Sequence, residues 1–298
     1  MGHAWEQTVL PILIKDRLLW SPANTGPIFL RNQIVTIHDL SIYDSNEGFS
    51  HSFIQTYKFI LPKVAKTAFR ILTDSEFSKR RIVELLKVRE EKVSAIHLGI
   101  DTNVFNPSRV LDEQMKKALG IPGDEYILCL GSLEPRKNLK RLINAWLAIQ
   151  NSLPKHLWLV IAGGNGSNQV FRQLKIDKTL ERVHFTGRVP DEVLPNLYAG
   201  AVLFVYPSLY EGFGFPPLEA MACGTPVITS NKSSLPEIIQ DVGITVDPTS
   251  IHDLAEAIEY MINTPSTREI LSSKGVEHSK NFSWESTVSQ TWKLLNEH

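Results

Sequence analysis

The chain has 298 residues, enough for one large or two ordinary domains. Its composition, 43% apolar and 21% charged, is that of a folded globular protein and argues against disorder. Its 31 Lys and Arg nearly balance its 32 Asp and Glu, so the net charge of −1 gives no overall field that would attract nucleic acid. Two cysteines far apart in apolar segments, Cys129 and Cys223, fit core residues in a reducing compartment. With no apolar run of membrane-spanning length and no basic leader, we expect a cytoplasmic protein.

The first hundred residues alternate short apolar strands with amphipathic helices, the pattern typical of a parallel sheet covered by helices. We expect strands at 17–20, 34–37, 70–73 and 92–96, and helices at 50–68 and 75–86. Four strands make only part of a doubly wound sheet. We therefore expect an incomplete N-terminal Rossmann-like domain.

From about residue 125 the alternation continues through a second region. Six strands are expected there, at 126–130, 157–162, 183–186, 202–206, 227–229 and 244–246, with helices beginning near Asn138, Asn168, Asp191, Pro217, Ser234 and Ile251. With right-handed crossovers these strands make a complete doubly wound parallel sheet. Glycine and Asn-Pro interrupt the pattern at 99–111, which indicates a hinge, so we expect an α/β protein with domains at 1–104 and 105–282, the first joined by a last helix at 283–298.

The segment Gly131–Leu139 places two adjacent cations, Arg136 and Lys137, after a strand and at a predicted helix start. Two positive charges are unfavourable at a helix N-terminus, because the helix dipole is already positive there. A phosphate bound to these side chains and to the backbone amides would remove that conflict. The alternative, that both side chains simply point into water, stays open at this point.

A second segment, Glu211–Ala222, also follows a strand and contains two carboxylates, two glycines and two prolines. Glu219 lies among apolar residues, where a carboxylate needs a partner, and a ribose diol would supply one. Gly212 and Gly214 would let a ligand approach the backbone amides, while Glu211 stands where it could bind hydroxyls of a second group. The alternative is a tight turn with one glutamate capping a helix and the other in solvent.

Thr36-Ile37-His38-Asp39 ends an apolar strand in an imidazole and a carboxylate, a position suited to ligand contact or proton transfer. A purely structural histidine is the alternative. The turn at 163–166 follows a strand but lacks the glycine spacing of a dinucleotide fingerprint, so we interpret it as a turn near a nucleotide. The sequence contains no Asp-x-Asp and no cluster with metal-ligand spacing, so neither a metal ion nor another cofactor is expected.

The segment 51–92 contains ten Lys and Arg against five Asp and Glu, a local charge of +5, together with four aromatic residues. This combination predicts peripheral contact with an anionic membrane surface. A solvated helix surface is the alternative.

Five blocks together resemble the retaining glycosyltransferases of family 4, also called group 1, which have the GT-B fold of two Rossmann-like domains. The blocks are EGFGFPPLEAMACGTPVI with Glu211 and Glu219 eight positions apart, GSLEPRKNL, FTGRVP, TIHD, and GID followed by Phe105 and Pro107. The N-terminal sequence, with WEQ…LP, SPANTGP and TIHDLSIYD, is similar to that of the bacterial mannosyltransferase-like branch. The resemblance implies a GT-B protein with a shortened N-terminal domain.

The resemblance also implies roles for individual residues. Arg136 and Lys137 would hold the donor diphosphate and Glu219 the nucleotide ribose, while Glu211 would contact the transferred sugar and His38 would reach the sugar or the acceptor. The implied catalytic residues are therefore His38, Glu211, Arg136 and Lys137. The implied donor-binding residues are Gly131, Arg136, Lys137, Gly187, Val189, Glu211, Gly212, Phe213, Gly214, Phe215, Leu218 and Glu219.

As a function, the resemblance implies metal-independent transfer of a hexose, with mannose favoured, from GDP-mannose or a UDP-hexose to a saccharide or lipid-linked acceptor in polysaccharide biosynthesis. It would take place in the cytoplasm or at the inner face of the membrane. The family's first strand and glycine-rich loop have no counterpart before the matching residues, so the resemblance implies an exposed edge of the N-terminal sheet, where a second copy or a partner chain could pair. A non-catalytic nucleotide-sugar-binding subunit or a truncated inactive homologue working with a partner chain is therefore the alternative, and a GT-B epimerase or phosphorylase is a third interpretation.

Overall fold

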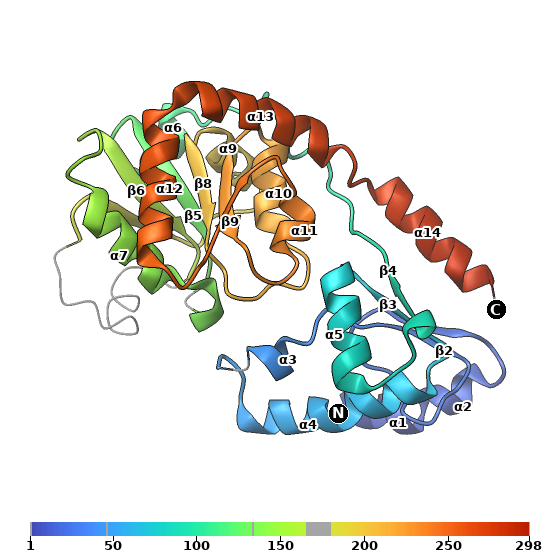
Figure 1. The fold of residues 1–298 in the computed structure, drawn as a ribbon. Helices are drawn as coiled ribbons and strands as arrows, with labels where there is room; N and C mark the ends of the chain where they lie inside the picture. The colour runs from blue at the N-terminus through green and yellow to red at the C-terminus, as the bar shows by residue number, and fades with distance from the viewer. Residues whose placement is uncertain (1, 46, 133, 165–179, 298) are drawn as a thin grey trace. The chain divides into compact units, whose positions relative to one another are not determined.

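The computed structural model describes residues 2–45, 47–132, 134–164 and 180–297 (Figure 1). Contacts between Cα atoms divide the chain into two compact units. The first comprises Met1–Gly99, Tyr210–Phe213 and Ser283–His298, and the second comprises Ile100–Leu209 and Gly214–Phe282. The first junction thus lies inside the interruption expected at 99–111, and the second lies at the start of the last helix.

One short segment departs from the expected division of the chain. Residues 210–213 were expected in the second domain, but they group with the first unit. The hydroxyls of Ser75 and Ser78 both donate to the carbonyl oxygen of Gly212, at 2.7 and 3.1 Å. The Tyr210 hydroxyl accepts from the backbone N–H of Leu40 at 3.3 Å. Both serines are fully buried, so these bonds supply partners that buried hydroxyls require.

The first unit is built on a four-stranded parallel sheet in the simple order β1-β2-β3-β4. The strands are β1 (Leu19–Ser21), β2 (Gln33–Thr36), β3 (Arg70–Thr73) and β4 (Val93–Ala95). Parallel strands need crossovers, and α4 (His51–Thr67) and α5 (Glu76–Leu86) provide two of them. All four strands expected from the sequence are therefore confirmed, within one or two residues at their ends.

The two faces of this sheet are covered differently. Apolar residues of α4 and α5 pack on one face in the larger core of the unit, where Val64 and Ile82 are fully buried. On the other face a smaller cluster of Ile34, Leu72 and Ile96 meets Leu294 and Leu295 of α14 (Trp284–Asn296). The last helix therefore belongs to the first unit.

Serine caps fix the helix starts of this unit. The Ser50 hydroxyl accepts from the N–H of Phe53 at the start of α4, and the Ser75 hydroxyl accepts from the N–H of Ser78 at the start of α5. The sequence analysis did not predict the short helices, which are α1 (Gly2–Thr8), α2 (Leu10–Ile14), α3 (Ser41–Asp44) and the 3₁₀ turn η1 (Glu90–Lys92).

The second unit contains a six-stranded parallel sheet in the order β10-β9-β8-β5-β6-β7. Its strands are β5 (Glu125–Leu130), β6 (Leu157–Ala162), β7 (Val183–Gly187), β8 (Leu203–Tyr206), β9 (Val227–Ser230) and β10 (Ile244–Val246). The chain runs outward from β5 to β7, returns to β8 beside β5, and then runs outward the other way. This is the doubly wound topology expected from the sequence, and all six strands are confirmed.

Helices follow the strands of this sheet. They are α6 (Glu113–Ala118), α7 (Leu139–Ile149), α9 (Leu194–Ala199), α10 (Phe215–Ala222), α11 (Leu235–Ile239), α12 (Ile251–Asn263) and α13 (Pro265–Ser279). Fully buried residues of α7 and α12, among them Trp146 and Ile258, form one core with the sheet. The helix expected near Asn168 lies outside the described residues.

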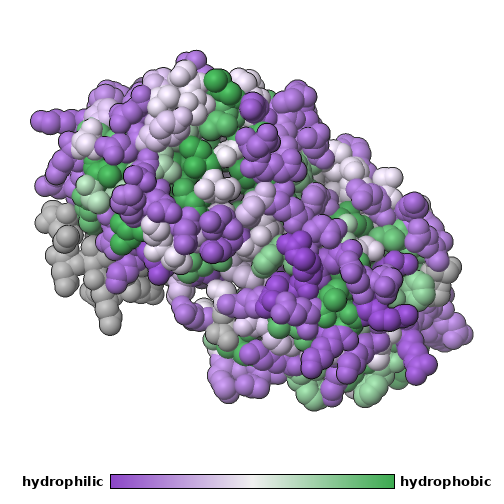
Figure 2. Space-filling model, viewed as in Figure 1, coloured by the Kyte–Doolittle hydropathy of each residue, from purple (hydrophilic) through white to green (hydrophobic). Residues whose placement is uncertain are grey.

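Two further expectations concern the cysteines and membrane-spanning helices. Cys129 and Cys223 are core residues as predicted, and burial raises the pKa of both thiols to about 12. Among the described helices, none combines the length and apolar character needed to cross a bilayer. The face shown in Figure 2 is largely hydrophilic, with apolar side chains scattered over it. Several large apolar side chains of the first unit are more than half exposed, such as Ile12, Phe29 and Phe59.

Candidate functional site

The order of the second sheet marks one position as special. Strand β5 has β6 on one side and β8 on the other, so the two halves of the winding diverge between β5 and β8. In open α/β sheets the loops at such a switch point separate and leave a crevice at the carboxyl ends of the strands, where ligands bind. The segments after β5 and β8 are the two that the sequence analysis singled out, at Gly131–Leu139 and Glu211–Ala222.

Arg136 and Lys137 lie after β5 in a 3₁₀ turn, η2 (Pro135–Lys137), and not in the first turn of an α-helix. Asn138 separates the turn from α7 with a left-handed backbone of φ 60°. Its buried side-chain amide donates to the carbonyl oxygens of Pro207 and Pro248 at 3.0 and 2.7 Å. Helix α7 therefore begins at Leu139, next to the start expected near Asn138, and the left-handed backbone of Asn138 keeps Arg136 and Lys137 outside the helix.

The turn that carries the two cations is fixed to the loop after β8. The carbonyl oxygen of Arg136 accepts from the N–H of Leu209 at 2.7 Å and from the Ser208 hydroxyl at 3.0 Å. The Lys137 ammonium donates to the Tyr206 hydroxyl and lies 5.0 Å from the centre of that ring. The structure thus brings both cations to the β5–β8 switch point, in a turn held by hydrogen bonds.

A carboxylate that the sequence analysis did not single out accompanies the cations. Glu134 accepts from Nε of Arg136 at 2.6 Å and from the Ser132 hydroxyl at 2.7 Å. Burial opposes its ionisation, but the Ser132 hydroxyl and the charges of Arg136 and Lys137 prevail and hold the pKa of Glu134 below its ordinary value. Glu134 therefore stays ionised at neutral pH and orients the Arg136 guanidinium.

Glu219 lies in α10, in the apolar surroundings that its neighbours predict. Its Oε2 accepts from the hydroxyl of the fully buried Tyr198 at 2.8 Å. Burial raises the pKa of Glu219, while the Tyr198 hydroxyl acts in the opposite direction. A partner for one oxygen of this carboxylate is thus supplied by the protein.

Glycines and small turns occupy the carboxyl ends of the neighbouring strands. Gly131 donates to the carbonyl oxygen of Ala162 at 2.9 Å, and Gly163 donates to that of Gly187 at 2.8 Å, which joins the ends of β5, β6 and β7. Gly187 has a φ of 71° and open space on its side-chain side. Gly214, with a φ of 123°, precedes α10, which begins with the half-buried Phe215 and also contains the buried Leu218. Val189 is half-buried just after β7.

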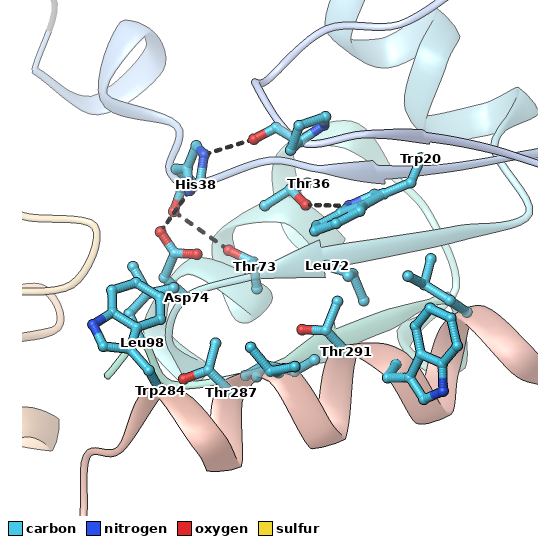
Figure 3. Close-up of a pocket in the computed structure, with 15 residues that line it drawn as sticks. Trp20, Thr36, His38, Leu72, Thr73, Asp74, Leu98, Trp284, Thr287 and Thr291 are labelled. Atoms are coloured by element: carbon cyan, nitrogen blue, oxygen red, sulfur yellow. Dashed lines mark hydrogen bonds and ion pairs between the residues drawn. The ribbon is translucent and has the colours of Figure 1, made fainter. Parts of the chain in front are cut away.

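In the first unit, His38 follows β2 and is held from two sides (Figure 3). Its Nδ1 lies 2.8 Å from Oδ2 of Asp74, and its Nε2 lies 3.0 Å from the carbonyl oxygen of Pro22. Both partners are acceptors, so both nitrogens donate only when the ring is the imidazolium. The Asp74 carboxylate raises the pKa of His38 despite partial burial, with smaller contributions from Pro22 and Asp39.

The residues Glu211, Gly212 and Phe213 stand in the first unit, in the segment held by Ser75 and Ser78. Glu211 and Phe213 are buried, and the Phe213 ring lies 6.0 Å from that of His97. A side chain at Gly212 would meet Cβ of Asp39 at 2.7 Å, so the close approach of this backbone requires a glycine. Within the described ranges, no three or more His, Cys, Asp or Glu side chains are grouped to hold a metal ion.

The sequence agrees with a known family over most of the second unit. The profile of the family "Glycosyl transferases group 1" matches residues 112–278, more than half of the chain. The chain belongs to this family of transferase enzymes. The match includes the turn with Arg136 and Lys137 and the start of α10 with Glu219.

Curated relatives and solved structures extend the likeness to this glycosyltransferase's first unit. O-antigen chain mannosyltransferase B of Escherichia coli is 35% identical over 288 residues, which span 94% of this chain and 75% of that protein. The serotype-specific mannosyltransferase WbdA of Escherichia coli is 31% identical over 78% of this chain, which spans only 29% of WbdA. Anabaena HepE, solved with UDP and glucose, superposes with a TM-score of 0.71 at 21% identity, covering 89% of this chain and 72% of HepE. The fold of this glycosyltransferase is GT-B.

These findings decide between the interpretations left open by the sequence. The family is one of transferases, and the named relatives are mannosyltransferases. A non-catalytic subunit, an epimerase and a phosphorylase are therefore not favoured.

Sequence reasoning missed several residues that hold the candidate site together. Asp74 follows β3 and His38 follows the adjacent β2, and the rule that parallel strands end at one edge would have paired them. Tyr206 ends β8, so its meeting with Lys137 could have been expected from the same rule. Tyr198 gave no such signal, because nothing in a buried aromatic residue indicates which carboxylate it contacts.

Proposed function

We propose that this glycosyltransferase moves a hexosyl group, mannose in the first place, from a nucleoside diphosphate sugar to a saccharide or lipid-linked acceptor in the synthesis of an O-antigen-type glycan. The observation that carries the proposal is the cationic turn at the β5–β8 switch point. The names of the relatives support the sugar, because the mannosyltransferases above are 31–35% identical to this chain. The complex of HepE with UDP and glucose supports the donor class.

Arg136 and Lys137 are the residues proposed to bind the diphosphate. Negative charge grows on the diphosphate as the bond to the sugar breaks, so cations placed there act most strongly in the transition state. Glu134 orients the guanidinium of Arg136 and Tyr206 orients the Lys137 ammonium, so little reorganisation remains when the donor arrives. Glu219 is proposed to accept from the ribose hydroxyls while Tyr198 holds its other oxygen.

The remaining roles rest on the family resemblance. Glu211 and the amides near Phe213 and Gly214 would contact the transferred sugar, and His38 would contact the sugar or the acceptor. Retention of the anomeric configuration and independence from metal ions belong to the same proposal. The sequence supports the second, since it lacks the Asp-x-Asp pair that metal-dependent sugar transfer would call for.

The deciding experiment uses the full chain with a panel of GDP- and UDP-sugars, an acceptor glycan and EDTA. We expect transfer from one mannosyl or hexosyl donor in the presence of EDTA. Lys137→Ala should lower kcat/KM by about 100-fold, the effect of removing one transition-state charge contact. Lys140→Ala, which removes an exposed lysine of α7 in the same region, is the matched control and should stay within about twofold.

Two results would contradict the proposal. One is equal turnover by the Lys137→Ala and Lys140→Ala variants, which would remove the cationic turn from the mechanism. The other is donor binding without sugar transfer or donor hydrolysis for any acceptor, which would indicate a non-catalytic nucleotide-sugar-binding protein. Loss of activity in EDTA, restored by Mg²⁺ or Mn²⁺, would overturn metal independence alone.

We further propose that strand β1 is an association edge. It pairs with β2 along one side, and it stands at the end of the four-stranded sheet in the described part of the chain. An open strand edge offers backbone donors and acceptors to another chain. Sedimentation velocity over a hundredfold concentration range should show self-association, and a monomer throughout would contradict pairing between copies.

Peripheral contact with an anionic membrane is proposed for a set of aromatic and basic side chains of α4, which we call the α4 surface: Phe53, Lys58, Phe59, Lys63 and Lys66. Phe59 is 58% exposed, and the Lys63 ammonium lies 3.3 Å from the centre of its ring. Phe53 stacks on Tyr57 at 4.2 Å, and Tyr57 meets His3 of α1, so α4 and the N-terminal helices are neighbours. Aromatic side chains among lysines are the composition that binds the headgroup region.

A further inference from the structure

A cavity of about 270 Å³ opens in the first unit between the sheet and α14 (Figure 3). Its lining comes from the ends of the strands on one side, with Trp20, Thr36 and Leu72, and from α14 on the other, with Thr287 and Thr291. It lies on the sheet face opposite α4 and α5, beside the small cluster of Ile34, Leu72 and Ile96. The residues that line the cavity all belong to the first unit, whereas the cationic turn belongs to the second.

Several polar side chains in the wall have hydrogen-bond partners within the protein. The indole N–H of Trp20 donates to the Thr36 hydroxyl at 3.1 Å. The Thr73 hydroxyl donates to the carbonyl oxygen of His38 at 3.4 Å, and the Thr287 hydroxyl donates to that of His97 at 2.7 Å. These residues therefore turn methyl groups and ring faces toward the space. A sugar, which needs several hydrogen bonds when it is desolvated, would find few here, whereas a hydrocarbon suits such a wall.

The exposure of the surrounding side chains also favours an apolar occupant. Trp20 and Trp284 are 44% exposed, and Trp292 and Val288 are 65% and 62% exposed, although all four line the cavity. Large apolar side chains gathered around one concavity, rather than scattered singly, mark a binding site. An apolar cavity of about 150 Å³ holds a benzene molecule, so this one has room for roughly ten carbon atoms.

One polar feature remains at the carboxyl edge of the sheet. His38 lines the cavity, its side chain is 42% exposed, and Asp74 and Pro22 fix its ring (Figure 3). Asp74 lines the cavity as well, so the polar pair stands at one end and the apolar wall extends under α14. An occupant with a hydrocarbon part and a polar end matches this division.

We propose that the cavity binds the hydrocarbon part of a lipid-linked acceptor, with the polar end of the acceptor toward His38. This inference rests on the proposed function, because it names the class of acceptor that the same enzyme would use. It adds that the acceptor is recognised through its lipid as well as through its sugar. An acceptor glycan without a lipid should accordingly bind more weakly than its lipid-linked form.

The test measures binding of geranyl phosphate and decyl phosphate to the full chain by tryptophan fluorescence, since three of the six tryptophans line the cavity. Both probes carry ten carbons and one phosphate, and they distinguish an isoprenoid from a straight-chain lipid. We expect saturable binding of at least one probe. Thr291→Phe and Val288→Phe, which fill the space from α14, should each weaken it by about tenfold, equivalent to about 1.4 kcal/mol.

Gln290→Phe is the matched control, because Gln290 is an exposed residue of α14 outside the cavity, and it should bind the probes like the parent chain. Thermal melting of each variant checks that it is folded. Three results would overturn the inference: saturable binding of neither probe, equal binding by the parent and both filling variants, or binding of mannose in place of the two phosphates. A further contrary result is a parent dimer that Thr291→Phe makes monomeric, since a second copy would then fill the cavity.

Failure of this inference can be distinguished from failure of the proposed function. Sugar transfer to a soluble acceptor without probe binding would support the glycosyltransferase activity and contradict the lipid site. Probe binding without any sugar transfer would support a lipid-binding cavity and contradict the proposed enzyme activity. Transfer to a lipid-linked acceptor with a lower KM than to the same glycan alone, lost in Thr291→Phe but not in Gln290→Phe, would support both.

Discussion

At the scale of single residues, the pair of His38 and Asp74 gives the clearest pH dependence. The Asp74 carboxylate raises the pKa of His38 above its ordinary value of 6.5. The folded state therefore binds this proton more tightly than the unfolded state, and the resulting stabilisation is complete below about pH 6.5 and lost as the pH rises through the higher folded pKa. We predict that Asp74→Asn lowers the pKa of His38 and costs more stability at pH 6 than at pH 9. The imidazole is 42% exposed, so the difference should be about 1 kcal/mol or less.

The measurement combines an NMR titration of the His38 ring with urea unfolding at the two pH values. Asp39→Asn is the control, because Asp39 contributes to the same pKa only through its charge and ranks below Asp74. A His38 pKa unchanged by Asp74→Asn would contradict the prediction, as would an equal loss of stability at pH 6 and pH 9.

At the scale of elements, strands were predictable and several helices were not. The ten strands in the described ranges are short, mostly apolar runs bounded by polar residues and turns, a pattern that can be recognised from neighbouring residues alone. Helix α13 has no continuous apolar stripe, and it forms because it packs on α10, where Gly275 allows Met221 to approach. The turn of Arg136 and Lys137 escaped prediction because it depends on Asn138 bonds to Pro207 and Pro248, residues far away in the chain.

Two glycines at the carboxyl ends of the strands should differ in how much an alanine substitution lowers stability. Gly163 has a φ of 112°, and a Cβ there would lie 2.8 Å from the carbonyl oxygen of Gly131, a backbone atom that cannot move aside. Gly163→Ala should therefore cost about 3 kcal/mol of unfolding free energy, from backbone strain and crowding together. Gly187→Ala is the matched control, since its φ of 71° is also unusual but its side-chain space is open, and it should cost about 1 kcal/mol. Urea unfolding of the full chain followed by circular dichroism measures both, and equal costs would show that crowding at β5 and β6 is unimportant.

At the scale of the whole molecule, the sequence identified the segments that carry the candidate residues, but it did not predict which of these segments lie together in the fold. The doubly wound order of the second sheet could be expected from alternation, and with it the position of Arg136 and Lys137 at a carboxyl edge. The grouping of Glu211–Phe213 with the first unit could not be expected from the sequence, because it depends on the hydroxyls of Ser75 and Ser78, more than 130 residues earlier. No local pattern carries such a pairing, so the sequence predicted a single donor segment where the structure divides it between two units.

Membrane contact is the prediction that concerns the chain as a whole, since its net charge of −1 gives no general attraction to anionic lipid. Only a local arrangement such as the α4 surface can then bind, and each lysine near an anionic bilayer contributes about 1 kcal/mol. Replacing all three lysines of that surface by glutamine should weaken binding to phosphatidylserine vesicles by about 100-fold at low salt. The matched control removes the same charge from exposed lysines elsewhere, Lys117, Lys155 and Lys274. Vesicle co-sedimentation at two salt concentrations separates the cases: equal losses in the two triple variants would indicate unspecific charge attraction, and parent binding that 0.5 M salt leaves unchanged would exclude the lysines as its cause.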